Sequence, residues 1–316
     1  MFRTRTEMPP SAGMCAGRIA VTGSTGLIGS YAVRELIAKG FDVAAVSRSG
    51  KGSAGVSLNL HDTEAVREFM SAYRPEYLLH LAWNIEPGYE FSPQNLEWVA
   101  SSLNLLQIFA ENGGRRAVFS GSCFEYDMNF GFLSEDVTPL NSSHLYGNAK
   151  SSLCRLSSLW AEQIKLSFAW GRVFFLYGKN ERPGRIVPYI INSLMKGVHP
   201  IIKYPYIMRD YLYAGDAAGG LIALMLSDYR GVVNICSGKV TALRDIAEKA
   251  AVLMHCPVPE YEEVYDENMP PFVVGDCRKL NQIIGFRPCY SWERGLSEVI
   301  EEMRSREENQ RSYSVL

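Results

Sequence analysis

A glycine-rich loop near the start of the chain constrains the fold more than any other feature. Gly23, Gly26 and Gly29 follow the apolar run 18–22 at the spacing G-x-x-G-x-x-G, and a helical pattern begins at Leu27. Gly23 allows a tight turn, Gly26 lets a pyrophosphate approach the backbone, and Gly29 lets the helix pack against the sheet. The free N–H groups and the dipole of the helix N-terminus favour phosphates. Ordinary strand-to-helix turns also contain glycines, but the order strand, loop, helix predicts dinucleotide binding.

Short apolar runs alternate with helical patterns along most of the chain. We expect strands at 18–22, 42–46, 77–82, 116–119, 166–175 and 232–236. We expect helices at 27–38, 63–73, 93–110, 146–163 and 214–227, and weaker ones at 278–284 and 292–304. This alternation is typical of an α/β fold of the Rossmann type, in which helices cover both faces of a doubly wound parallel sheet. The polar tail after Ser305 is expected to fray.

Prolines and glycines interrupt the pattern after the strand at 166–175, which indicates a second and smaller unit. We expect a flexible N-terminal arm, a dinucleotide-binding domain of the Rossmann type, and a mixed α/β C-terminal domain that binds the substrate. Their expected ranges are 1–16 for the arm, 17–173 with 211–236 for the first domain, and 174–210 with 237–316 for the second. The chain therefore crosses between the two domains more than once.

The composition excludes several classes of protein. The 316 residues carry a formal net charge of −2, and 47% of them are hydrophobic. This apolar fraction is too high for a disordered chain, and the charge balance argues against a nucleic-acid partner. Nowhere does an apolar run reach the ~18 residues of a membrane span. The seven scattered cysteines predict reduced thiols in a cytoplasmic protein, and neither a disulfide framework nor a metal site is expected.

The end of the second expected strand bears on the choice of cofactor. An Asp or Glu at this point would accept hydrogen bonds from the adenosine ribose, but the chain has Arg48, which Ser47 and Lys51 are expected to assist in binding a phosphate. A guanidinium can pair with a 2′-phosphate, so we expect NADP(H), with NAD(H) as the alternative. A solvated Arg48, or one that stacks on adenine, is also compatible with the sequence.

Three further residues form a candidate catalytic group. Tyr146 and Lys150 stand at i, i+4, so they share one face of a helix. A nearby ammonium is expected to lower the phenol pKa from ~10 and make Tyr146 an acid or base toward a substrate oxygen. Ser122 stands at the end of an expected strand, where ligands bind in doubly wound sheets. Each motif alone also fits a surface pair or a turn serine, but their order along the chain is far more specific.

Together these motifs resemble the extended short-chain dehydrogenase/reductase family, of the nucleotide-sugar epimerase, dehydratase and reductase type. The resemblance covers the chain from Gly17 to about Arg304. The segments that carry it are 22–29, 80–82, 119–123, 146–150, 172–178, 209–216, 234–238 and 280–288.

The resemblance implies that the Rossmann domain holds NAD(P) and that the C-terminal domain holds a nucleotide diphospho-sugar. In the family, Ser122, Tyr146 and Lys150 would form the catalytic triad. The positions implied for the cofactor are Gly23, Thr25, Gly26, Leu27, Ile28, Gly29, Arg48, Asn59, Leu60, Leu81, Ala82, Trp83, Tyr146 and Lys150. The positions implied for the substrate are Trp83, Ser122, Cys123, Phe124, Glu125, Phe175, Arg185 and Arg209.

Arg209 matches the arginine that clamps the diphosphate in the family, although a salt bridge between domains is the alternative. Asn59 departs from the family, which has an Asp near adenine. Phe175 replaces a family Asn, and this suggests a more apolar pocket.

The residues after Ser122 bear on the type of reaction. Related 4,6-dehydratases have an Asp-Glu pair there, whereas this chain has Cys123 and Phe124. Glu125 comes later and enters the pocket only if Phe124 faces away. We therefore expect an NADPH-dependent reduction of the C4 ketone of an NDP-4-keto-6-deoxy sugar. An NAD-dependent nucleotide-sugar C4 epimerase is the alternative, and a non-catalytic NADP sensor is a distant one.

The resemblance also implies an oligomeric state. In the family, the helices expected at 93–110 and 146–163 form a four-helix interface between two subunits, so a homodimer is expected. The alternative is that both helices are simply buried against the sheet.

Overall fold

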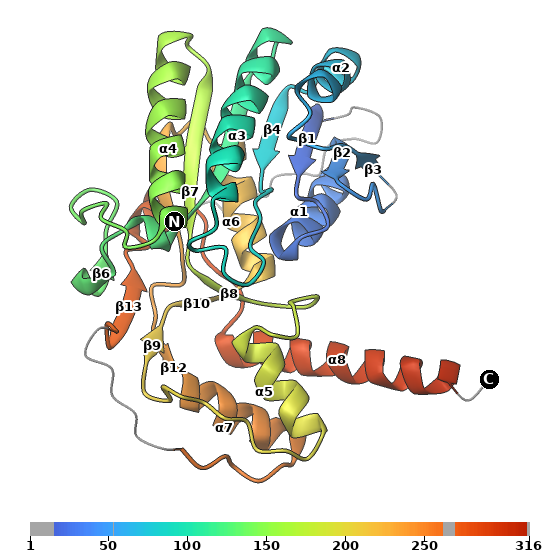
Figure 1. Ribbon diagram of the computed structural model, residues 1–316, viewed down its shortest axis with the longest axis vertical. Coiled ribbons are helices and arrows are strands. Elements are labelled where there is room, and N and C mark those ends of the chain that lie inside the picture. Colours follow the sequence, from blue (N-terminus) through green and yellow to red (C-terminus); the bar gives the residue numbers. More distant parts are fainter. Residues whose placement is uncertain (1–15, 53, 262–268, 315–316) are drawn as a thin grey trace, which may run out of the picture.

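The computed structural model describes residues 16–52, 54–261 and 269–314 (Figure 1). Nearly all of the expected N-terminal arm lies outside these residues. At the centre, a parallel sheet has the strand order β11-β7-β5-β4-β1-β2-β3. Its strands are β1 (Arg18–Thr22), β2 (Asp42–Ser47), β3 (Gly55–Ser57), β4 (Tyr77–His80), β5 (Arg116–Ser122), β7 (Ser167–Val173) and β11 (Gly231–Ile235).

Five helices cover the two faces of this sheet. Helices α1 and α6 pack together on one face, whereas α2, α3 and α4 pack in series on the other, each face with its own apolar cluster. Their bounds are α1 (Leu27–Ala38), α2 (Thr63–Tyr73), α3 (Gln94–Glu111), α4 (Leu145–Gln163) and α6 (Ala214–Leu226). The prediction of a doubly wound, Rossmann-type α/β fold is therefore confirmed.

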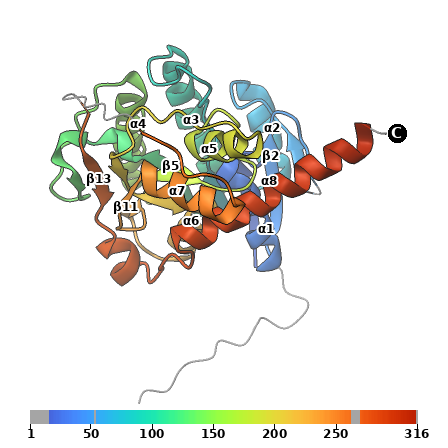
Figure 2. The ribbon, with the colours of Figure 1, turned by 90° about the horizontal axis from the view of Figure 1, so that it is seen from below.

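The remaining elements gather near the carboxyl ends of the central strands (Figures 1 and 2). One small sheet has the order β12-β9-β13-β6, and another pairs β10 with β8. The strands are β6 (Phe132–Leu133), β8 (Phe175–Tyr177), β9 (Met208–Arg209), β10 (Tyr211–Tyr213), β12 (Thr241–Ala242) and β13 (Phe272–Gly275). The helices are α5 (Ile186–Met195), α7 (Leu243–Met254) and α8 (Trp292–Ser314), with short turns η1 (Cys123–Glu125), η2 (Met128–Phe130) and η3 (Lys279–Ile283).

Helix α8 corrects one expectation. The polar tail after Ser305 does not fray, because α8 continues to Ser314 and extends past the rest of the molecule (Figure 2). Glu302 and Arg306 form an ion pair one helical turn apart, which supports this part of the helix.

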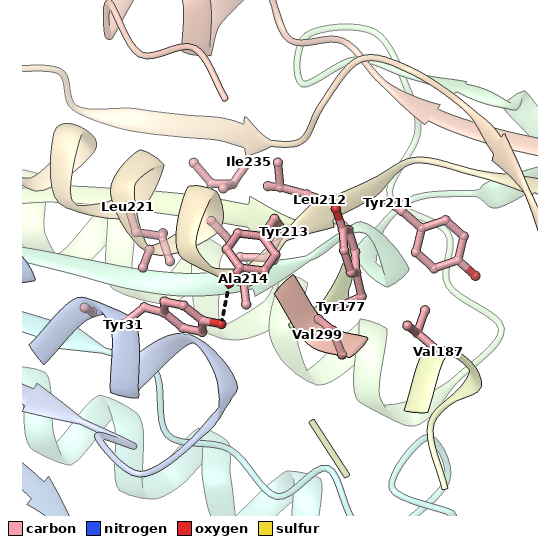
Figure 3. Close-up of a cluster of buried hydrophobic side chains, with 14 of the residues drawn as sticks. Tyr31, Tyr177, Val187, Tyr211, Leu212, Tyr213, Ala214, Leu221, Ile235 and Val299 are labelled. Carbon is pink, nitrogen blue, oxygen red and sulfur yellow. Dashed lines mark hydrogen bonds between the residues drawn. The ribbon is translucent and has the colours of Figure 1, made fainter. Parts of the chain in front are cut away.

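An aromatic cluster joins the first helix to the C-terminal elements (Figure 3). Tyr31 of α1 donates a hydrogen bond from its hydroxyl to that of Tyr213, at 3.0 Å. The Tyr213 ring in turn stacks on Tyr290 with 4.5 Å between ring centroids. The cluster therefore ties α1, which follows the glycine loop, to segments nearly two hundred residues later in the chain.

Buried Arg116, at the start of β5, holds the end of α6. Its guanidinium donates to the carbonyls of Leu224 at 2.6 Å, Met225 at 2.7 Å and Tyr229 at 2.9 Å. The last carbonyls of a helix have no partner within the helix, and a cation there also complements the helix dipole.

Candidate active site

The glycine loop fits a dinucleotide phosphate. Gly23 has a positive φ of +69°, and a Cβ at Gly29 would lie 2.1 Å from the Gly23 carbonyl oxygen, so both positions require glycine. Helix α1 begins after Gly26 without a side-chain cap. Among the described residues, the buried Ser24 hydroxyl has no hydrogen-bond partner. The loop thus offers uncapped N–H groups and an unused hydroxyl to an anion.

A buried histidine positions the end of β4 beside this loop. The Thr22 hydroxyl accepts from the N–H groups of Leu81 at 3.2 Å and Ala82 at 3.3 Å, so its own proton is available for His80 Nδ1 at 2.7 Å. His80 Nε2 must then carry the ring proton and donate to Ser102 Oγ at 2.9 Å. Burial lowers the pKa of His80 to about 3, so the ring is neutral.

The residues expected near the adenosine of the cofactor differ in their exposure to solvent. Arg48 is exposed at the end of β2, and its carbonyl accepts from Ser57 Oγ at 3.1 Å. Asn59 is also exposed, whereas Leu60 is buried in the apolar cluster beneath α2. Among the described residues no carboxylate pairs with Arg48 within salt-bridge distance, so its guanidinium is available to a ligand.

The three candidate catalytic residues come together. Ser122 is the last residue of β5, and Tyr146 and Lys150 lie in the first turns of α4. A side-chain hydrogen bond from Ser122 favours the ionised form of Tyr146. Lys150 Nζ donates to the Ser120 carbonyl of β5 at 2.9 Å. Ser122 and Lys150, which stand 28 positions apart in the sequence, therefore both lie at the end of β5.

The acidities of this group differ from the expectation. Burial raises the pKa of Tyr146, with smaller contributions from Tyr89 in the same direction. Burial also lowers the pKa of Lys150 to about 7. Lys150 Nζ lies 6.0 Å from the centre of the Tyr146 ring and points toward Ser120 instead. The net pKa of Tyr146 is therefore raised and not lowered as expected, because burial outweighs the effect of an ammonium at this distance.

Glu125 is not a substrate contact. Its side chain is 0% exposed, and Oε2 accepts from Arg172 Nε at 2.7 Å. Oε1 accepts from the Ser122 N–H at 2.8 Å and from Trp170 Nε1 at 2.9 Å. Both oxygens are therefore in use, and Glu125 anchors the backbone of Ser122 from behind. Its predicted role in the pocket is wrong, because the turn after β5 directs Glu125 into the protein interior.

Aromatic rings surround Tyr146. Phe124 lies 6.4 Å from the Tyr146 ring centre and 5.9 Å from that of Phe175. Tyr89 meets Tyr146 edge to face at 4.9 Å. Sequence reasoning missed Tyr89, which lies in a turn without a motif. Cys123 is buried beside this group, in the apolar cluster around Phe174 and Cys236.

Two arginines and one glutamate lie farther out. Arg209 Nη1 donates to the carbonyls of Met208 and Pro270, each at 2.9 Å, and its guanidinium lies 5.7 Å from the Phe175 ring centre. In the described part of the chain no carboxylate forms a salt bridge with it, so that alternative is not observed. Arg185 lies over Tyr89 at 5.7 Å. Glu181, also missed from the sequence, is near Arg185, and burial raises its pKa to about 8.

Comparison with known proteins decides the family. The model of the NAD dependent epimerase/dehydratase family matches residues 19–236. The chain belongs to this family. It is thus an enzyme of the extended short-chain dehydrogenase/reductase type, as its motifs predict.

Relatives of this family member differ in their named reactions. This chain is 27% identical over 245 residues to the dTDP-6-deoxy-L-talose 4-dehydrogenase (NAD(+)) of Aggregatibacter actinomycetemcomitans. The match covers 73% of this chain and 88% of that protein. The chain is 24% identical to the UDP-N-acetyl-alpha-D-glucosaminuronate decarboxylase of Bacillus cytotoxicus, covering 91% and 98%. The UDP-glucose 4-epimerase of Thermotoga maritima has a similar fold, with a TM-score of 0.81, 23% identity and coverage of 92% and 99%.

No group of three or more His, Cys, Asp or Glu side chains within the described residues is arranged to hold a metal ion. No described helix combines the length and apolar character that a membrane crossing needs.

Proposed function

We propose that this enzyme uses NADPH to reduce the C4 ketone of a nucleoside diphosphate 4-keto-6-deoxy sugar. The observation that carries the proposal is the set of aromatic rings beside Tyr146. Phe124 stands where related dehydratases have an acid, and it forms an apolar wall with Phe175. A 6-deoxy sugar presents a methyl group that suits such a wall, and the wall provides no acid for eliminating water. The similarity to a protein named for 6-deoxy-talose 4-dehydrogenation supports the same substrate class.

The side chains suit reduction. A bound nicotinamide would supply the hydride, and the protein's own side chains would bind and protonate the substrate oxygen. Ser122 positions the ketone oxygen, and Tyr146 donates a proton to the alkoxide as it forms. Tyr146 is protonated at neutral pH, since its pKa lies above the ordinary value of ~10, so it holds the proton that the alkoxide takes. Lys150 places a positive charge beneath them, and Glu125 holds the Ser122 backbone.

We further propose a preference for NADP(H), because the exposed Arg48 can pair with a 2′-phosphate. The test compares the kcat/KM ratio for NADPH and NADH in the wild type and in Arg48→Ala. We expect the ratio to fall at least tenfold in the variant, and an unchanged ratio would contradict the role of Arg48. Lys39→Ala, which removes an exposed cation just after the C-terminal end of α1, is the control.

The NAD-dependent C4 epimerase is the second candidate. It is favoured by the family's name and by the likeness of the fold to UDP-glucose 4-epimerase. Such an enzyme retains its cofactor and regenerates it within each turnover, so it would not consume NADPH.

One experiment separates the candidates. Purified protein is incubated with NADPH and with dTDP-, GDP- and CDP-4-keto-6-deoxyhexoses, and in parallel with NAD and UDP-glucose. Cofactor oxidation with a keto sugar supports the reductase, whereas epimerised UDP-hexose without net cofactor change supports the epimerase. Tyr146→Phe should lose about 10²- to 10⁴-fold in kcat while it retains NADPH binding. Binding without turnover in the wild type, on any substrate, would favour the sensor.

We also propose a homodimer formed through α3 and α4. Leu96 of α3 is 61% exposed, and Leu156 and Leu159 of α4 are 51% and 53% exposed, which is unusual for leucines on adjacent helices. Light scattering should give twice the monomer mass for the wild type and the monomer mass for Leu156→Glu. A cytoplasmic location and the residue ranges of the two domains remain predictions from the sequence.

A further inference from the structure

The site contains an aromatic residue whose contacts go beyond lining a pocket. Trp83 follows β4, and its indole lies directly against the catalytic lysine: the Lys150 ammonium is 3.8 Å from the centre of the Trp83 ring. This is well within the ~6 Å at which a cation and an aromatic face attract each other. The same ring lies edge to face with Tyr146 at 6.1 Å. Trp83 therefore touches both members of the Y-x-x-x-K pair.

The indole is held in place from the other side. Trp83 Nε1 donates to Asn95 Oδ1 at 2.9 Å. Asn95 is 2% exposed, and its Nδ2 donates to the carbonyls of Tyr89 at 2.7 Å and Ser92 at 2.8 Å. With both amide protons used, only Oδ1 can face the indole, so the amide fixes the ring. Trp98 adds a stacked contact at 5.8 Å.

The ammonium, by contrast, lacks an ionic partner at close range. Lys150 is 2% exposed, and among the described residues no carboxylate oxygen lies within 4 Å of Nζ. The Glu125 carboxylate raises the pKa of Lys150, but both Glu125 oxygens bind other donors. The other groups that face Lys150 are neutral His80 of β4, Tyr146 of α4 and the Trp170 ring of β7 at 6.0 Å. A buried ammonium in this setting is stabilised by one carbonyl and by aromatic faces.

We propose that Trp83 is a positioning residue that holds the Lys150 ammonium against its indole face and so keeps Lys150 charged during the reaction. This inference rests on the proposed function, in which Lys150 places a positive charge under the reacting oxygen. A cation–π contact is suited to the task, because it stabilises the charge without neutralising its field as a carboxylate would. The Ser120 carbonyl and the Trp83 face together fix the position of the ammonium.

The first test measures Lys150 directly and needs no substrate. Protein is labelled with [ε-¹³C]lysine, the Lys150 signal is assigned by its loss in Lys150→Met, and the signal is followed by NMR from pH 5 to 10. The titration midpoint should fall by about one pH unit in Trp83→Leu, which keeps apolar bulk and removes the π face. The midpoint should fall by less in Trp83→Phe, since phenylalanine retains a smaller aromatic face. Trp98→Leu, from the same aromatic cluster, is the matched control and should leave the midpoint unchanged.

Each result of this test decides the proposal. An unchanged midpoint in folded Trp83→Leu overturns it, and so does an equal shift in the Trp98→Leu control. If Trp83→Leu does not fold, the comparison of Trp83→Phe with wild type serves, and an unshifted midpoint in Trp83→Phe then overturns it. Because the measurement uses unliganded protein, its outcome is independent of which sugar the enzyme reduces.

The second test connects the contact with turnover. With an accepted 4-keto sugar and NADPH, the alkaline decline of kcat should move to lower pH in Trp83→Leu by the same interval as the NMR midpoint. Trp83→Phe should restore most of the profile. A kcat that is uniformly lower with an unmoved pH profile would show a merely structural role for Trp83. Failure to find any accepted sugar would count against the proposed function and leave the NMR result standing.

Discussion

The buried ion pair behind Ser122 gives the sharpest prediction. Glu125 and Arg172 are 0% and 4% exposed, with 2.7 Å between Oε2 and Nε. Burial alone would lower the pKa of Arg172, but the Glu125 carboxylate more than offsets this and raises it. Glu125→Gln preserves shape and removes the charge. An amide oxygen can still accept from Ser122 and Trp170, but the amide N–H groups then face the Arg172 donor.

The expected cost follows from these contacts. Leaving one member of a buried ion pair uncompensated costs about 3–5 kcal/mol. At roughly 2 °C per kcal/mol for a large domain, the melting temperature should fall by roughly 6–10 °C. Because Glu125 also holds the Ser122 N–H, kcat should fall as well.

The assay is chemical unfolding at pH 7, followed by tryptophan fluorescence and circular dichroism. Arg172→Met and the double variant complete a mutant cycle. The double variant should be no less stable than the worse single variant, because removing both charges leaves none unpaired. A loss below about 1 kcal/mol in Glu125→Gln, or strictly additive losses in the double variant, would refute the reasoning.

Two further changes test other parts of the structure. Arg116→Met removes the cation that binds two carbonyls in the last turn of α6 and the Tyr229 carbonyl after it, and should cost about 2–3 kcal/mol in denaturant unfolding. Arg115→Met, whose ion pair with Glu76 is largely exposed, should cost less than about 1 kcal/mol and is its control. Burial raises the pKa of Glu181 from 4.5 to about 8, so this group's contribution to stability is full below pH 4.5 and is lost as pH rises through 8. Glu181→Gln should therefore stabilise the fold at pH 9 but not at pH 4, and an equal effect at both would contradict the assignment.

Local features of the sequence were sufficient to predict most strands of the central sheet and the helices that cover it. The spacing of the glycine loop is typical of a tight strand-to-helix turn, and the structure shows the close approach of Gly29 to the Gly23 carbonyl that such a turn requires. Apolar runs marked most central strands because a parallel sheet buries both faces. The i, i+4 spacing of Tyr146 and Lys150 placed them on one helix face.

Such local patterns could not predict how the loops lie relative to one another. Tyr89 and Glu181 lie in loops with no periodicity, and they come near the site only because loops from different strands end at the same edge of the sheet. Polar residues after Ser305 matched a fraying end, but the ion pair of Glu302 with Arg306 depends on the helix already existing.

The chemistry of the site divides in the same way. The sequence by itself determined which residue types are present and which of them lie on one helix or at one strand end, because those relations are set by backbone geometry over a few residues. Only the tertiary structure decided their acidities and partners. It turned Glu125 inward, raised the pKa of Tyr146 by burial and placed the Trp83 ring 3.8 Å from Lys150. These properties depend on desolvation and on contacts between segments far apart in the chain, and no pattern within a single segment encodes them.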